Sequence, residues 1–127
     1  MSSDSALLDI YHDVDRELTS RDYACRACGK CCDFEANDYK LYASQIEKQL
    51  VIEKTGRRPV LVNGCCCFLD AAGKCTIHPW RPLGCRTYFC DRAGEGNVPE
   101  ELHERALARI KETAARHETG WQYGWFF

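Results

Sequence analysis

Cysteine is the residue that most constrains what this chain can fold into. The sequence has 127 residues, of which ten are cysteines. The cysteines form two groups. The first has the spacing Cys25-x2-Cys28-x2-Cys31-Cys32. The second contains Cys65, Cys66, Cys67, Cys75, Cys85 and Cys90. A cysteine content of this order is typical of a disulfide scaffold or of a metal-binding domain.

The N-terminal sequence favours one of these two uses. The residues MSSDSALLDIYHD lack the basic start and apolar stretch of a secretory signal. We therefore expect the chain to be cytoplasmic, where thiols stay reduced and a disulfide scaffold, the alternative, does not persist. Coordination deprotonates a thiol and protects it from oxidation. The sequence thus predicts metal ions as partners.

Length and charge argue against several other classes of protein. The chain fits one domain, so we expect a single metal-binding domain over residues 1–127. The 17 basic and 19 acidic residues give a net charge of −2, which argues against a nucleic-acid partner. No apolar run approaches the roughly 18 residues of a transmembrane helix, which argues against a membrane partner. Motifs for phosphate loops, serine hydrolases and zinc proteases are missing, so nothing marks the chain as an enzyme.

Hydrophobic periodicity predicts three helices. The apolar positions of the first, over residues 4–20, are Leu7, Leu8, Tyr11, Val14 and Leu18. The second is expected to begin near Asn37 or Asp38, with its apolar stripe at Tyr42, Ile46 and Leu50, and to end before Gly56. The apolar positions of the third, over residues 99–118, are Leu102, Leu107, Ile110 and Ala114.

The remaining segments complete the expected fold. Short β-branched or apolar stretches at residues 59–62, 66–69 and 74–77 predict a small hairpin. We therefore expect a small α+β metal-stabilised domain, with about three helices around a cysteine-rich centre that contains a short β-hairpin. The cysteine-cluster core spans about residues 25–90. The aromatic tail, residues 121–127, is expected to pack on the helices or to contact a protein partner.

The spacing of the first cysteine group indicates a metal centre. Gaps of two residues between Cys25, Cys28 and Cys31 let a tight turn direct their sulfurs at one metal. Thiolates suit zinc, and they equally suit iron and iron–sulfur clusters. The Cys-x3-Cys-Pro ending of the ferredoxin run does not follow here, because Cys32 comes directly after Cys31. The sequence favours zinc or mononuclear iron, with an iron–sulfur cluster as the alternative cofactor.

Four motifs together carry a resemblance to a known family. The patterns C-x2-C-x2-C-C, C-x-F-L, G-x-C-x-I and R-P-x-x-C-R, over roughly residues 25–90, resemble the CxxCxxCC family, also called the YkgJ-type family. Its members are described as chelators of zinc or iron through eight cysteines. Carried over by position, those ligands are Cys25, Cys28, Cys31, Cys32, Cys66, Cys75, Cys85 and Cys90. Cys66 is chosen because it stands two residues before Phe68, which leaves Cys65 and Cys67 as extras.

Charged neighbours of these cysteines are candidates for supporting the centre. Arg26, Arg81 and Arg86 could donate to the thiolates, although surface ion pairs or contacts to carbonyl groups explain Arg81 and Arg86 equally well. His78, three residues after Cys75, is a further candidate ligand or donor. Three functions stay open: chelation of zinc or iron, an iron–sulfur protein in electron transfer or redox sensing, and a metal-stabilised adaptor for protein interactions.

Overall fold

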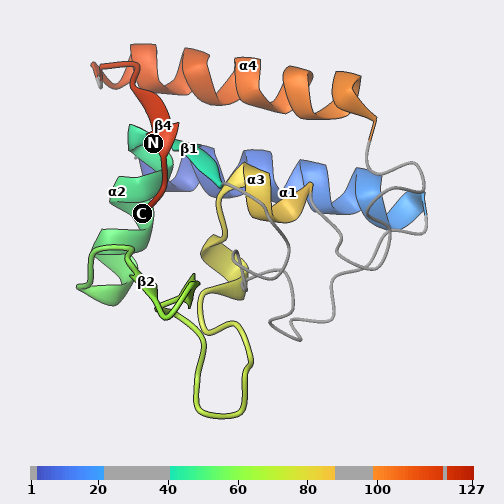
Figure 1. The fold of residues 1–127 in the computed structure, drawn as a ribbon. Coiled ribbons are helices and arrows are strands. Elements are labelled where there is room, and N and C mark those ends of the chain that lie inside the picture. The colour runs from blue at the N-terminus through green and yellow to red at the C-terminus, as the bar shows by residue number, and fades with distance from the viewer. Residues whose placement is uncertain (1–2, 22–40, 88–98, 119) are drawn as a thin grey trace.

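The computed structural model describes residues 3–21, 41–87, 99–118 and 120–127 (Figure 1). Its helices are α1 (Ser3–Ser20), α2 (Gln45–Thr55), the short 3-10 helix η2 (His78–Trp80), α3 (Leu83–Arg86) and α4 (Glu100–Arg116). Its strands are β1 (Tyr42–Ser44), β2 (Leu61–Val62), β3 (Cys65–Cys66) and β4 (Tyr123–Trp125). The expected α+β class is confirmed, and the described ranges alone contain four α-helices where about three were expected. No helix in the described ranges is long and apolar enough to cross a membrane.

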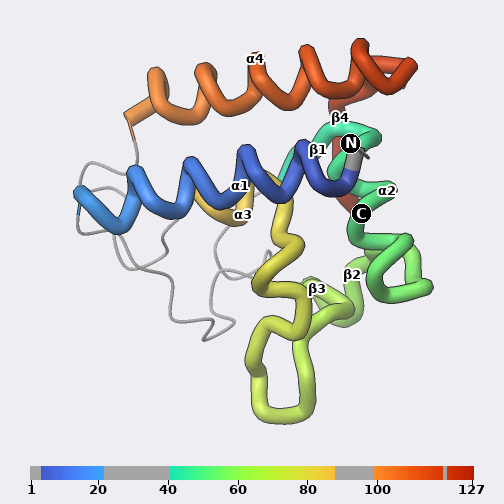
Figure 2. Tube along the Cα trace, turned by 180° about the vertical axis from the view of Figure 1, so that it is seen from behind, coloured from blue at the N-terminus to red at the C-terminus, as the bar shows by residue number. Residues whose placement is uncertain are grey.

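Helices α1 and α4 form one layer of the molecule. They lie side by side and antiparallel, as Figures 1 and 2 show from opposite sides. Their bounds confirm the predicted helices 4–20 and 99–118 to within two residues. Their apolar stripes pack against side chains of α2 and α3 in a first core cluster. Helices of this length are stabilised mainly by burying one apolar face in this way. The buried members of the cluster include Leu7, Tyr11, Val14, Leu18, Ile46, Leu50, Leu83, Leu102, Ile110 and Ala114.

Helix α2 begins later than predicted. The expected helix from residue 37 or 38 included Tyr42, but Tyr42–Ser44 is the strand β1 and the helix starts at Gln45; residues 37–40 lie outside the described ranges. The strand forms because β4 supplies it with an antiparallel partner. The predicted end is confirmed: Gly56 adopts the left-handed conformation, with φ of 71°, and its N–H donates to the carbonyl of Ile52.

A buried carboxylate joins three of the helices. Glu47 of α2 is 1% exposed and accepts four hydrogen bonds. Its Oε1 accepts from the hydroxyl of Tyr11 in α1 at 2.9 Å and from the N–H of Leu83 in α3 at 2.7 Å. Its Oε2 accepts from the N–H and the hydroxyl of Ser44, which closes the capping box of α2. A buried carboxylate persists without a cationic partner when hydrogen bonds replace its hydration.

The predicted hairpin is confirmed, with shorter strands and a different turn. Leu61 pairs with Cys66 and Val62 with Cys65. The turn between them is Asn63–Gly64, with φ of 52° and 80°, a sequence that suits the left-handed turns of two-residue hairpins. The third predicted stretch, residues 74–77, contributes only a single bridge, between Cys75 and Leu69.

The aromatic tail packs on the body of the molecule and also forms a strand. Trp121 packs against the first core cluster, and Phe126 is 1% exposed within a second cluster. That second core cluster is formed by Leu41, Ala43, Val51, Cys66, Phe68, Ile77 and Phe126. The tail residues Tyr123–Trp125 pair with β1, a pairing that the sequence analysis missed.

The four hydrogen bonds of Glu47 predict a specific loss of stability. Glu47→Gln turns one acceptor into a donor that faces the donors of Ser44, Leu83 or Tyr11. We expect the free energy of unfolding to fall by about 2–4 kcal/mol, and by about 1 kcal/mol in Tyr11→Phe, which removes one bond. Chemical denaturation of both variants measures these losses. Glu112→Gln, on the exposed face of α4, is the control, and an equal loss there would contradict the role of Glu47.

Candidate metal centre

The structure describes half of the cysteines. Cys65, Cys66, Cys67, Cys75 and Cys85 lie in the described ranges, and no disulfide joins any two of them. The other five predicted positions, Cys25, Cys28, Cys31, Cys32 and Cys90, lie outside those ranges together with Arg26.

The three described ligand candidates come from three segments and contact one cluster. Cys66 lies on β3 and is 7% exposed within the second core cluster. Cys75 follows the turn after Leu69, and Cys85 lies on α3; both are half-buried and pack against the same cluster. Within the described ranges, no three His, Cys, Asp or Glu side chains converge closely enough to hold a metal. The described part therefore gathers three thiols in one region without completing a metal site.

Local hydrogen bonds place Cys75 in this region. Asp70 donates its N–H to the carbonyl of Lys74 at 2.9 Å, and its carboxylate accepts from the N–H groups of Ala72 and Lys74. Gly73 takes φ of 77° at the end of this turn. The N–H of Thr76 then donates to the carbonyl of Phe68 at 2.9 Å. These bonds bring the chain after the turn back beside β3.

Cys67 has a different environment from Cys66. Its sulfur accepts from the N–H of Val60 at 3.5 Å and lies 3.9 Å from the carbonyl of Arg58. The N–H of Phe68 lies 3.5 Å from the sulfur of Cys66. Cys66 is a buried member of the second core cluster, whereas Cys67 is half-buried, packs against that cluster, and has its sulfur against the backbone of Arg58 and Val60, just before the hairpin.

Two buried arginines surround Cys85. Arg81 donates from Nε to the carbonyl of His78 at 2.9 Å and from Nη1 to the carbonyl of Cys85 at 3.4 Å. Arg86 donates to the carbonyls of Arg81 and Pro79 and forms a 2.6 Å ion pair with Asp15 of α1. These contacts tie η2 and α3 to α1, so they fix the position of the Cys85 backbone.

Arg86 also contacts an aromatic ring. Its guanidinium carbon lies 4.1 Å from the ring centroid of Tyr11, the residue that donates to Glu47. Burial lowers the pKa of Arg86, while the charge of Asp15 raises it. For Tyr11, burial and the neighbouring Glu47 carboxylate raise the pKa of the phenol well above its usual value. The phenol therefore stays a neutral donor.

His78 presents a buried nitrogen to the same region. Its Nε2 is buried and has no hydrogen-bond partner in the part of the chain that the structure describes. Burial lowers the pKa of His78, and the charges of Arg81 and Arg86 lower it further, against the opposing effect of Asp15. The neutral form carries the ring lone pair that a metal or a hydrogen-bond donor requires. The spacing Cys75-x2-His78 was the signal for this residue in the sequence.

One protein family has a model that matches the segment containing the candidate metal centre. The model of the CxxCxxCC family, described as "Putative zinc- or iron-chelating domain", matches residues 24–109. The chain belongs to the CxxCxxCC family. No curated protein and no solved structure matches it. The match contains all eight cysteines predicted as ligands and ends within α4, so that α1 and β4 lie outside it.

The lowered pKa of His78 predicts how stability depends on pH. A histidine whose pKa falls on folding stabilises the fold above the unfolded value of about 6.5, and this contribution is lost as the pH falls. We expect the Tm of the wild-type chain to drop more between about pH 7.5 and about pH 5.5 than the Tm of His78→Phe. Thermal unfolding at matched metal content measures both. His117→Gln, exposed after α4, is the control and should keep the wild-type dependence. Equal slopes for His78→Phe and wild type would refute the prediction.

Proposed function

We propose that this member of the CxxCxxCC family binds zinc or iron through a multi-cysteine thiolate centre, with no catalytic role. The proposed ligands are Cys25, Cys28, Cys31, Cys32, Cys66, Cys75, Cys85 and Cys90. The observation that carries the proposal is the gathering of Cys66, Cys75 and Cys85, from three separate segments, around the second core cluster.

The chemistry of these donors fits the metals that the family description names. Thiolate sulfur prefers zinc and iron over the hard cations that oxygen ligands bind. Partial burial against Phe68, Ile77 and Trp80 limits the access of water to the sulfurs. A metal that joined these thiols to ligands on either side of them would cross-link distant parts of the chain and add to its stability.

The arginines fit the charge that such a centre carries. Four thiolates around one divalent ion leave a net charge of −2, which requires cationic or hydrogen-bond donors nearby. Arg81 and Arg86 bring two buried positive charges to the segment that bears Cys85. We assign them the role of supporting the centre, and Arg26 the same role beside Cys25. His78 is the further donor, because its buried Nε2 has no partner among the described residues.

Metal content tests the proposal and separates the possible centres. The chain is purified without oxygen, and its zinc, iron and acid-labile sulfide are measured on one sample. Zinc or iron at about one to two per chain without sulfide supports the thiolate centre. Iron with a matching amount of sulfide would contradict the thiolate centre and favour the alternative function, an iron–sulfur protein in electron transfer or redox sensing. Absence of bound metal would refute the chelating function and leave the adaptor function.

A matched pair of cysteine variants tests the ligand assignment. Cys75→Ser should lose about half of the bound metal or more and lower the Tm, because a proposed ligand is removed. Cys67→Ser should keep the wild-type metal content, because the Cys67 sulfur faces the backbone of Arg58 and Val60. Elemental analysis and thermal unfolding measure both effects. Full metal content in Cys75→Ser would show that the assignment is wrong. Cys66 is unsuitable for this test, since it is also a core residue.

A further inference from the structure

The sheet formed by β1 and β4 turns a row of aromatic rings outward. Register pairs Tyr42 with Trp125, and Tyr123 lies two residues before Trp125, so the three side chains share one face. Their ring centroids lie 6.3 Å apart for Tyr42 and Tyr123, and 6.5 Å apart for Tyr42 and Trp125. Trp121 and Phe127 continue the row, at 5.9 Å from Tyr123 and 5.5 Å from Trp125. We call these five residues the aromatic face.

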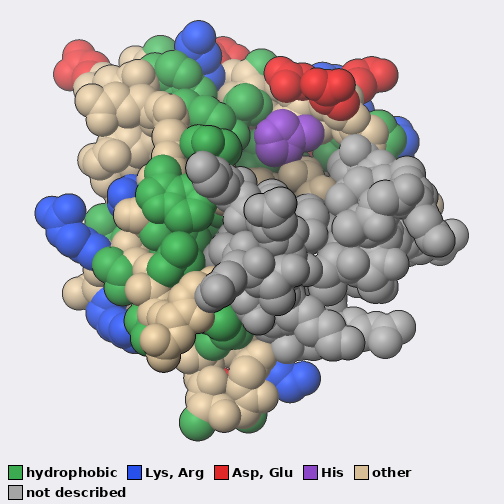
Figure 3. Space-filling view, in the orientation of Figure 1, with side chains coloured by type: hydrophobic (Ala, Val, Ile, Leu, Met, Phe, Trp, Pro, Cys, Tyr) green, Lys and Arg blue, Asp and Glu red, His purple; other side chains and the backbone are tan. Residues whose placement is uncertain are grey.

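The aromatic face is exposed although its members are large. Tyr42, Tyr123 and Trp125 are 47%, 42% and 40% exposed. Figure 3 shows hydrophobic side chains gathered over this part of the surface. Tyrosine and tryptophan, together with arginine, are enriched among the residues that dominate the binding energy of protein interfaces. A contiguous exposed group of them is typical of an interaction site.

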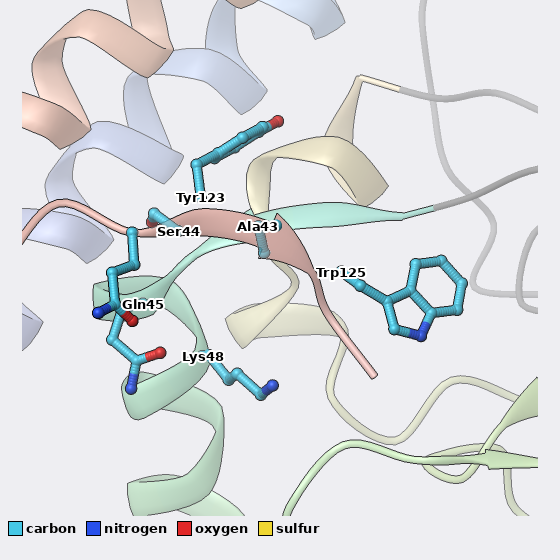
Figure 4. Close-up of a pocket in the computed structure, with 8 residues that line it drawn as sticks. Ala43, Ser44, Gln45, Lys48, Tyr123 and Trp125 are labelled. Atoms are coloured by element: carbon cyan, nitrogen blue, oxygen red, sulfur yellow. The ribbon is translucent and has the colours of Figure 1, made fainter.

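A pocket of about 310 Å³ opens beside the aromatic face, between β4 and the first turn of α2. Lys48 is the one charged residue among those that line it, and the amide side chains of Gln45 and Gln122 also contribute. Figure 4 shows Lys48 extending beneath β4, toward the end that Trp125 flanks. Gly124 pairs with Ala43 and so lies on the face of the sheet opposite the aromatic rings, where both residues line the pocket. It leaves the pocket open, because a Cβ added there would meet no atom within 4 Å.

A second lysine lies beside the aromatic face. The ammonium of Lys111, on α4, lies 5.8 Å from the ring centroid of Trp121. In the part of the chain that the structure describes, the six ion pairs all use arginines, and neither Lys48 nor Lys111 joins one. The aromatic face is thus accompanied by two lysines that are available to carboxylates of another molecule.

We propose that the aromatic face and the Lys48 pocket bind an extended acidic segment of a partner protein. Apolar and aromatic side chains of that segment stack on Tyr42, Tyr123 and Trp125, and an acidic side chain enters the pocket to pair with Lys48. A second carboxylate pairs with Lys111. This inference does not rest on the proposed metal centre, because none of its residues is a proposed metal ligand.

A protein segment fits this surface better than a single-stranded nucleic acid. Aromatic stacking with lysines would also bind bases and phosphates. A nucleic-acid strand, however, places a phosphate at every nucleotide, whereas the pocket offers one ammonium. Burial raises the pKa of the Tyr123 phenol, and the negative charges of Glu47 and of Glu104 on α4 raise it further. A continuous polyanion would be repelled there, while a peptide can space its carboxylates to avoid it.

Fluorescence polarisation with defined probes tests the proposal on the full chain in its metal-loaded form. The probe is a labelled octapeptide of alternating glutamate and tyrosine. The same peptide with glutamine in place of glutamate, and labelled oligothymidine, are the comparisons. We expect the acidic peptide to bind at least about fivefold more tightly than either. No saturation up to about 1 mM, or tighter binding of oligothymidine, would overturn the proposal.

Two pairs of variants locate the site. Lys48→Gln should weaken binding of the acidic peptide by about fivefold. Lys54→Gln, the same change elsewhere on α2, should leave that binding unchanged. Gly124→Val should fill the pocket without strain, because a β-branched residue suits a strand and open space surrounds the position. Gly124→Val should weaken binding of the acidic peptide while keeping the wild-type Tm and metal content. Gly120→Val, outside the pocket, should leave peptide binding unchanged. Equal effects within either pair would place the peptide elsewhere and refute the assignment.

Discussion

The buried carboxylate of Glu47 is the interaction on which the described structure depends. It caps its own helix, receives the phenol of Tyr11 from α1 and holds the first N–H of α3 through Leu83. Because a buried carboxylate is costly without donors, any arrangement that separated these helices would remove two of its four hydrogen bonds, those from Tyr11 and Leu83. Tyr11 extends the network, since its ring receives the guanidinium of Arg86. The position of Cys85 on α3 therefore follows from contacts that begin at Glu47.

This network explains how thiols can gather around an apolar cluster. The second core cluster collects side chains from β1, α2, the hairpin and the tail; Cys66 is one of its members, and Cys75 and Cys85 pack against it. Arg81 and Arg86 hold the chain between η2 and α3 by binding its carbonyl groups. The described scaffold thus organises these three cysteines through apolar packing and hydrogen bonds. In the proposed centre, metal binding acts on a partly organised ligand set, which lowers the entropy that must be lost on coordination.

Local signals predicted α1, α4 and the end of α2, because periodicity and a C-terminal glycine are encoded within a few residues. The apolar stretches also predicted a hairpin, but its turn at Asn63–Gly64 was missed. Local signals did not reveal the pairing of β1 with β4, since Tyr42 and Trp125 are far apart in the chain and a short apolar segment reads equally well as a helix. Glu47 resembled an ordinary surface residue of a helix, because burial of a polar side chain is a property of the assembled fold. For the candidate site, motif spacing identified the cysteines, whereas the carbonyl partners of Arg81 and Arg86 depend on packing.

The β1–β4 sheet links the two proposed sites physically. Its inner face contributes Ala43 and Phe126 to the cluster that the thiols contact, while its outer face carries Tyr42 and Trp125. A partner that bound the outer face would stabilise the strand pairing and therefore the packing of Phe126 beneath it. Coupling between two binding events is reciprocal, so a metal that ordered the inner cluster would strengthen partner binding by the same factor. Such coupling requires no change of fold, because the two ligands would share one small sheet whose order each favours.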